Sequence, residues 1–274
     1  MRRCEFCDSP VAADAVVCPV CKEEIAEETL ERLLPLLKRP DEPEVQRIGI
    51  IQRMWGTIRR PAPTYRDIGQ RPDSAGPFFI VMINALIMGV LMLLMTSRFT
   101  TTVQLFDPIA NATVPTQVSV LTGPQAISFW MVGLGTMVPN ILIGMIFLIV
   151  GSAFAHIAIK ILGGSGKRGQ TISIVGYSMM PVLLVRLIAI LLIFTTVPTI
   201  AIGTAETNAA TVITQIYNSS VWTTIDYLTT GAFLWTGFLL IFGIREAHNT
   251  STQWAAVISI ACIIVLIWTF WQMH

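Results

Sequence analysis

Four cysteines near the start of the chain have the spacing of a metal site. Cys4, Cys7, Cys18 and Cys21 form two Cys-x2-Cys pairs separated by ten residues. Two such pairs let four thiolates converge tetrahedrally on Zn²⁺, with Zn–S bonds of about 2.3 Å. Because four thiolates leave no open coordination position, the spacing predicts a structural zinc site, with iron in a similar site as the chemical alternative.

Residues 1–24 are therefore predicted to form a small zinc ribbon. Nucleic-acid-binding domains gather Lys and Arg on one face. The ribbon instead carries charges of both signs, namely Arg2, Arg3 and Lys22 against Glu5, Asp8 and Asp14. We expect it to bind a protein partner or to form a folded cap, and not to bind nucleic acid.

The composition predicts a membrane protein. The chain is 53% hydrophobic and 13% charged, whereas soluble domains are about 25% charged. Residues 1–77 hold twelve of the 18 Lys and Arg and thirteen of the 17 Asp and Glu. This asymmetry predicts a helical linker at 25–77, after the ribbon, and a membrane domain at 78–274.

Five apolar segments are long enough to cross a hydrocarbon core of about 30 Å. They are 78–97, 139–161, 172–197, 227–244 and 254–271. Residues 99–126 are expected to form an exposed loop, and Pro181 is expected to kink the third span. Gly133, Gly135 and Pro139 interrupt the apolar run before the second span, so 127–138 is expected to lie along the interface. The predicted fold class is an all-α, five-span membrane bundle preceded by the ribbon.

The last part of the linker has the pattern of a basic amphipathic helix. Apolar residues recur at helical spacing between Val45 and Ile58, with arginines between them. Such a helix suits the surface of an anionic leaflet. A linker helix packed on the ribbon is the alternative.

The positive charges predict the orientation. Arginines precede the first span, Lys160, Lys167 and Arg168 lie between the second and third, and Arg245 follows the fourth. The positive-inside rule then places the N-terminus in the cytosol and, after five crossings, the C-terminus outside. No signal peptide is recognised at the N-terminus. Asn111 and Asn218, each in an Asn-x-Ser/Thr triplet, would face outward as candidate glycosylation sites.

The loop between the second and third spans, "GGSGKRGQTISIVGYSMMP", is not a nucleotide site. A Walker A motif requires Ser or Thr after Gly-Lys, and Arg168 follows Lys167 here. A dinucleotide fingerprint requires a βαβ unit, and the flanks are membrane helices. The glycines instead suit a tight turn between two spans.

This stretch resembles the signature of the Yip (Ypt/Rab-interacting protein) family. The matching residues are Gly163, Gly164, Gly166, Gln170, Gly176, Tyr177, Ser178 and Pro181. Segments 59–77 and 242–255 resemble the family's entry segment and its turn between spans four and five. Together the likeness covers about 45–274.

The resemblance implies a five-span domain with a cytosolic N-terminus and an external or lumenal C-terminus. We expect a non-enzymatic scaffold that binds protein partners through the zinc-ribbon region and organises or shapes the membrane. Eukaryotic members reside in Golgi and endoplasmic-reticulum membranes and contact prenylated Rab GTPases. The zinc ribbon departs from the eukaryotic pattern and looks like a prokaryotic arrangement, so Rab binding is not carried over. We expect a plasma-membrane protein that binds lipids and an unidentified protein partner, with a homo-oligomer left open.

Polar residues within the spans support a rival function. Asn84, Asn140, His156, Arg186 and Asp226 lie in or at the edges of the apolar segments, and such residues are costly in lipid. Arg186 and Asp226 are expected to pair as a structural tie between helices. The rival is a small-solute or ion transporter with a path lined by these five residues. No spacing links a nucleophile to a base, so an enzyme, including an intramembrane hydrolase, is not expected.

Overall fold

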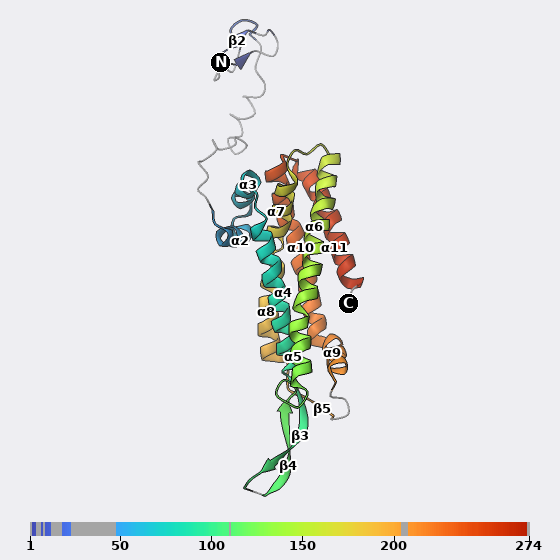
Figure 1. Cartoon of the computed structure of the whole chain (residues 1–274). Helices are drawn as coiled ribbons and strands as arrows, with labels where there is room; N and C mark the ends of the chain where they lie inside the picture. Colours follow the sequence, from blue (N-terminus) through green and yellow to red (C-terminus); the bar gives the residue numbers. More distant parts are fainter. Residues whose placement is uncertain are drawn as a thin grey trace. The chain divides into compact units, whose positions relative to one another are not determined.

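The computed structural model describes residues 2–3, 7, 9–11, 18–22, 48–109, 111–203 and 208–272 (Figure 1). The chain divides into two compact units, 1–47 and 48–274. In the first unit, β1 (Arg2–Arg3) pairs antiparallel with β2 (Pro10–Val11). The predicted linker at 25–47 lies outside the described residues.

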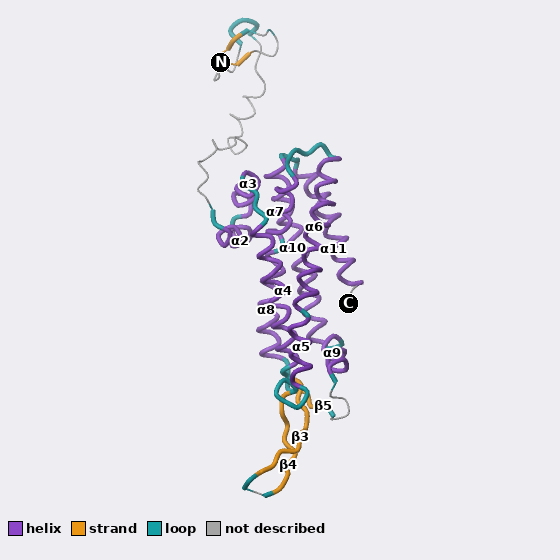
Figure 2. Tube along the Cα trace, in the orientation of Figure 1, coloured by secondary structure: helices purple, strands orange, loops and turns teal. Residues whose placement is uncertain are grey.

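The second unit is a helical bundle, and its described residues include five segments long and apolar enough to cross a membrane. They are α4 (Ala75–Thr96), α5–α6 (Ala126–Gly135 and Met137–Ile161), α7–α8 (Arg168–Ser178 and Met180–Thr196), α10 (Ser220–His248) and α11 (Thr252–Gln272). Helix α10 packs against α8, α7 and α11, and α4 packs against α6, α7 and α8 (Figure 2). The five-span prediction is confirmed.

The second span is longer than the sequence suggested. A Cβ on Gly133 would meet Leu93, and one on Gly144 would meet Val81, so α5 and α6 follow the same neighbour, α4, in the opposite direction. The expectation that 127–138 leaves the span to lie along the interface is therefore corrected. The glycines, which look like breaks in the sequence, are the places where α4 side chains approach the helix backbone.

The third span is broken, as predicted. Helix α7 ends at Ser178, Met179 joins the two helices, and Pro181 lies in the first turn of α8. Proline has no backbone N–H and suits a first turn, where that donor would lack an intrahelical acceptor. The break therefore falls where the sequence placed the kink.

The segment after α4 is a β-hairpin where an exposed loop was expected. Strands β3 (Phe99–Asp107) and β4 (Ala112–Ser119) pair antiparallel, and β5 (Ile200–Ile202) pairs parallel with β3. Strand β4 is largely exposed, as expected for that segment. The reason for the strands is the high content of Thr and Val, whose branched side chains favour extended backbone.

Three short helices complete the described part of the second unit. Helices α2 (Ile50–Arg59) and α3 (Pro61–Gln70) precede α4, and α9 (Ala209–Tyr217) precedes α10. Helix α3 packs against α10 and α7. One apolar cluster, which includes Tyr65 and Tyr177, lies near α3, and a second, which includes Phe99 and Trp222, lies near the sheet.

Candidate functional site

Three cysteines of the first unit form a cluster that could hold a metal ion. The sulfur atoms of Cys7, Cys18 and Cys21 all lie within 4.8 Å of one another, and those of Cys7 and Cys18 are 3.5 Å apart. Four thiolates at about 2.3 Å from a tetrahedral Zn²⁺ are about 3.8 Å from each other, so the spacing fits that ion. Cys4, the fourth predicted ligand, lies outside the described residues.

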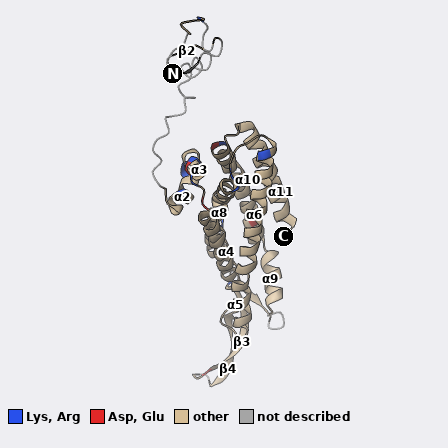
Figure 3. Ribbon diagram, turned by 45° about the horizontal axis from the view of Figure 1, so that its top comes forward, with Lys and Arg blue, Asp and Glu red and all other residues tan. Residues whose placement is uncertain are grey.

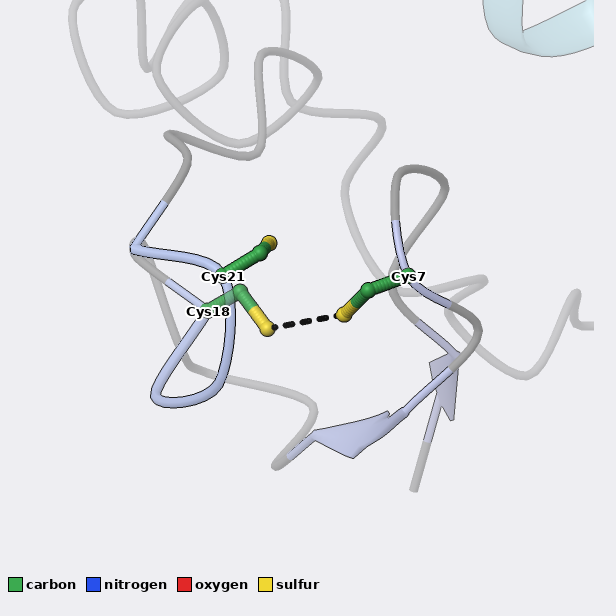
Figure 4. Close-up of side chains that lie close together, drawn as sticks. All are labelled: Cys7, Cys18 and Cys21. Atoms are coloured by element: carbon green, nitrogen blue, oxygen red, sulfur yellow. Dashed lines mark hydrogen bonds between the residues drawn. The ribbon is translucent and has the colours of Figure 1, made fainter.

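The local backbone explains how the cluster forms. Cys18 and Cys21 project from one turn, which the Lys22 N–H closes by donating to the Cys18 carbonyl at 2.9 Å, and Cys7 faces them from the other segment (Figure 4). Hydrogen bonds from Ser9 lower the pKa of the Cys7 thiol to about 6. A thiol with this pKa is largely thiolate at neutral pH, and the thiolate is the form that binds metal.

The second candidate site lies in the membrane domain, at the end that carries α2 and α3. We call this the signature end; it also includes the loop 162–167 and the turn 249–251. Figure 3 shows charged residues gathered around it, whereas the helices beyond it are almost entirely tan. Polar groups buried there must be paired, because an unpaired charge in a low-dielectric interior is costly.

Arg53 on α2 is the centre of this polar network. Its side chain is buried, with Nε 2.8 Å from Asp67 Oδ2 and Nη1 bonded to Asp73 Oδ2. Burial opposes its positive charge, but the two carboxylates outweigh that effect and raise the pKa of Arg53. Arg53 therefore stays charged and ties α2 to α3 and to the start of α4.

Asp73 extends the network into the signature segment. The Tyr177 hydroxyl donates to Asp73 Oδ2 at 3.1 Å, the Gly76 N–H donates to Asp73 Oδ1 at 2.7 Å, and the Ser173 hydroxyl donates to the Asp73 carbonyl. A Cβ on Gly76 would lie 1.9 Å from the Tyr177 hydroxyl. Glycine is therefore required for the tyrosine to reach the aspartate.

Two further contacts join α3 to the signature segment. Gln170 Nε2 donates to the Gly69 carbonyl at 2.6 Å, and the hydroxyls of Tyr65 and Ser178 are 2.7 Å apart. Ser178 also donates to the Ile174 carbonyl, so the Tyr65 hydroxyl is the donor in their bond. Burial raises the pKa of Tyr65, which keeps its proton available for this bond.

Tertiary contacts explain why two positions of the signature require glycine. Gly166 has φ +131°, and a Cβ there would lie 2.2 Å from His248 Nδ1. Gly176 lies against Pro77, and a Cβ there would be 2.3 Å from the proline ring. Both positions therefore require glycine because another side chain lies close to the backbone.

A chain of hydrogen bonds links two histidines beneath the loop. His248 Nδ1 is 2.7 Å from the Ser165 carbonyl, and His248 Nε2 is 3.2 Å from the Thr171 hydroxyl. Since a carbonyl only accepts, neutral His248 carries its proton on Nδ1 and accepts from Thr171 at Nε2. Thr171 then accepts from His156 Nδ1, 2.9 Å away. The chain joins α6, α7 and α10 at the signature end.

The structure does not bring the five predicted intramembrane residues to one place. His156 belongs to the histidine chain, and Asn140 Nδ2 donates to the Thr136 carbonyl of its own helix. The Oδ1 atom of Asn84 is buried and bonds to none of the described residues. Arg186 contacts Met88 and interacts electrostatically with Asp226.

Sequence reasoning missed most of the signature-end network. The residues missed are Arg53, Asp67, Asp73, Thr171, Glu246 and His248, where Glu246 bonds both Arg66 and Arg245. Asp67 and Asp73 lie in 59–77, and Glu246 and His248 lie in 242–255. These are the stretches that carried the family resemblance, so rare charged residues within them were the available signal.

The fold and this network define a helical multi-pass membrane protein whose entry segment, signature loop and α10–α11 turn form one polar assembly. The Yip1 domain family model matches residues 55–273, and the chain belongs to that family. Searches of curated proteins and of solved structures find no match. The match covers α3 and every predicted span, while the cysteine cluster lies before it.

Proposed function

We propose that the protein is a non-enzymatic membrane scaffold that recruits a cytosolic protein through its cysteine cluster and organises the surrounding bilayer. The observation that carries this proposal is the Arg53 network, which holds α2 and α3 against the signature end. An entry segment held rigidly against the bundle provides a fixed surface to which protein partners can bind at the membrane. The zinc ribbon at 1–24, with Cys4 as its fourth ligand, is the recruiting module in this proposal.

The exposed face of α2 supports contact with the bilayer surface. Arg53 is buried, whereas Ile51 and Trp55 are 75% and 56% exposed. On a helix exposed only to water, Ile51 and Trp55 would be expected to be buried and Arg53 to be exposed. Arg59 and Arg60, at the C-terminal end of α2, are exposed. In our proposal α2 lies at the cytosolic leaflet, with its apolar residues in the interface and its arginines near anionic headgroups.

This placement also supports the proposed orientation. Lys160 and Arg245 lie in the last turns of α6 and α10, and Lys167 and Arg168 lie at the start of α7. Helix α3 packs against α7 and α10, so these cations belong to the signature end. Cationic residues favour the cytosolic side of a membrane. We therefore propose a cytosolic signature end and N-terminus, in the plasma membrane of a prokaryote.

A transporter gains less support from the same contacts. A transport path needs polar groups that face a shared cavity near mid-membrane. His156 is bonded within the histidine chain, Asn140 is bonded to its own helix, and Arg186 lies beside Asp226. These residues serve separate helix contacts, which favours a structural role for each.

A crosslinking pull-down from native membranes tests the scaffold. The double variant Cys4→Ser/Cys7→Ser removes two predicted zinc ligands, and Cys262→Ser removes the cysteine of α11 as a matched control. We expect a discrete partner with the wild type and with Cys262→Ser, and its loss with the double variant. Bound zinc, measured by elemental mass spectrometry, should follow the same pattern. A partner that persists without zinc would remove the recruiting role from the ribbon.

Liposome flux separates the scaffold from the transporter. The wild-type chain and Arg186→Ala are reconstituted separately, and the uptake of ions and small solutes by the two samples is compared. The scaffold predicts no protein-dependent flux in either sample. Flux that the Arg186 substitution abolishes would favour the transporter.

A further inference from the structure

An apolar cavity opens within the membrane-spanning part. It has a volume of about 350 Å³ and lies between α6, the α7–α8 break, α10 and α11. Its walls are mainly apolar, and include Phe147, Phe154, Val175, Met179, Leu240 and Leu266. We infer that this cavity is a binding site for one acyl chain of a bilayer phospholipid.

The cavity is continuous with the surface that faces lipid. Its rim includes Val150 and Phe154 of α6 and Val265 of α11, all strongly exposed side chains on helices that qualify as spans. Hydrocarbon chains are therefore the medium at its mouth. A chain that enters gains dispersion contacts with walls that otherwise face a void.

Water does not suit the cavity. A buried water needs two to four polar partners. The hydroxyl of Ser178 already donates to the Ile174 carbonyl and accepts from Tyr65, and the Thr269 hydroxyl donates to the Val265 carbonyl. Thr236 also lines the cavity, and its buried hydroxyl bonds to none of the described residues. One free hydroxyl does not supply the two to four partners that a buried water needs, so the surface left to a guest is mainly apolar.

A transmembrane helix of a second protein does not fit either. A helix with its side chains is about 10 Å across, as wide as the usual spacing between two packed helices, so it would have to displace one of the helices that line the cavity. A methylene group occupies about the volume of a water molecule in the liquid, near 30 Å³, so roughly ten carbons of a flexible chain fit. Size thus selects a single acyl chain over a protein partner.

Two features of the sequence create the space. Gly151 lines the cavity, and a Cβ there would meet no atom within 4 Å. The helix break at Met179, imposed by Pro181, bends α7–α8 where Val175, Ser178 and Met179 line the same space. The missing side chain and the break together leave a gap that the neighbouring helices do not close.

The position of the site links lipid to the signature end. Ser178 lines the cavity and bonds Tyr65 of α3, the helix that Asp67 joins to Arg53. A bound chain therefore packs against the residue that anchors the entry segment. The lipid acts as a structural component beneath the proposed platform.

Photolabelling in a defined bilayer tests the site. The full chain is placed in phosphatidylcholine nanodiscs that contain a trace of phosphatidylcholine with a diazirine at mid-chain, irradiated, digested and mapped by mass spectrometry. We expect label on Phe147, Met179 and Cys262. Because Gly151→Phe fills the cavity, it should reduce label at Met179 and Cys262 roughly fivefold.

Gly231→Phe is the matched control. Gly231 is exposed on α10, has open space at its Cβ position and does not line the cavity. It should leave the label at Met179 and Cys262 unchanged. Equal labelling in the wild type and both variants, or label spread evenly over the outer faces of α6 and α11, would overturn the site.

A second measurement covers failure of the phenylalanine variant to fold. Size-exclusion chromatography and circular dichroism establish whether Gly151→Phe is native, and Gly151→Leu replaces it if it is not. Native mass spectrometry of the wild type in detergent should show one phospholipid retained per chain. A wild-type chain that retains none after mild extraction would contradict the inference.

Discussion

The two ends of the membrane domain are held together in different ways. At the signature end, side chains bond across long stretches of sequence, such as Gln170 to the Gly69 carbonyl and Tyr65 to Ser178. At the opposite end, which we call the hairpin end and which comprises the β4–β3–β5 sheet and α9, backbone ladders and an apolar cluster around Phe99 and Trp222 join the elements.

The difference has consequences for how each end responds to change. Apolar packing loses stability gradually, in proportion to the atoms removed. A buried polar network loses it abruptly, because removing one partner leaves another buried and unsatisfied. The signature end should therefore be the more sensitive to substitution. It should also have the more sharply defined geometry, which suits a surface that binds a protein partner.

The largest effect should come from breaking the buried ion pair. Asp67→Ala leaves the Arg53 guanidinium buried with one of its two carboxylates, which should cost about 3 kcal/mol. Thermal unfolding of the purified protein in detergent measures the loss. Asp107→Ala at the hairpin end removes a carboxylate that accepts the exposed Ile109 N–H and should cost about 1 kcal/mol or less. Equal losses at both ends would remove the contrast.

A glycine substitution should have an intermediate effect. In Gly166→Ala the new Cβ would meet His248 Nδ1 at a backbone angle that L-residues rarely adopt, so we expect a loss of about 2 kcal/mol. Gly203→Ala at the hairpin end has open space at its Cβ position and should stay within about 0.5 kcal/mol of the wild type. Unfolding in the same detergent compares the two. A neutral Gly166→Ala would show that His248 need not approach the loop.

The smallest effect should come from one hydroxyl. Tyr65→Phe removes the donor to Ser178, which still bonds the Ile174 carbonyl, so we expect a loss of about 1 kcal/mol at pH 7. Tyr227→Phe, at an exposed tyrosine of α10, is the control and should be neutral. A loss as large as that of Asp67→Ala would mean that Tyr65 has a further role in the network.

The same variant sharpens the comparison at high pH. Burial raises the pKa of Tyr65 in the folded protein, so the unfolded chain ionises first, near pH 10. The stabilisation is fully present below that pH and is lost as pH rises above it, by up to about 1.4 kcal/mol per pH unit. Tyr65→Phe should flatten this alkaline limb in unfolding measured between pH 8 and 11. An unchanged slope would show that Tyr65 is not protected by burial.

The sequence pattern was sufficient to predict the structure where residues close together in the chain determine it. The five apolar lengths predicted the spans, Pro181 predicted the break in α7–α8, and the Cys-x2-Cys spacing predicted a cluster that Cys7, Cys18 and Cys21 form. The pattern failed at 127–138, because glycines that weaken an isolated helix were instead contact points for α4. It also missed the hairpin at 99–119, whose strands need each other to form.

The sequence by itself determined the number of spans, the family and the cysteine spacing, since each depends on residues close together in the chain. Only the tertiary structure decided that Arg53 meets Asp67 and Asp73, that Tyr65 reaches Ser178, and that a cavity remains beside Gly151. These contacts join segments up to 113 residues apart. Their energies depend on burial, which arises only when separate helices pack and exclude water between them.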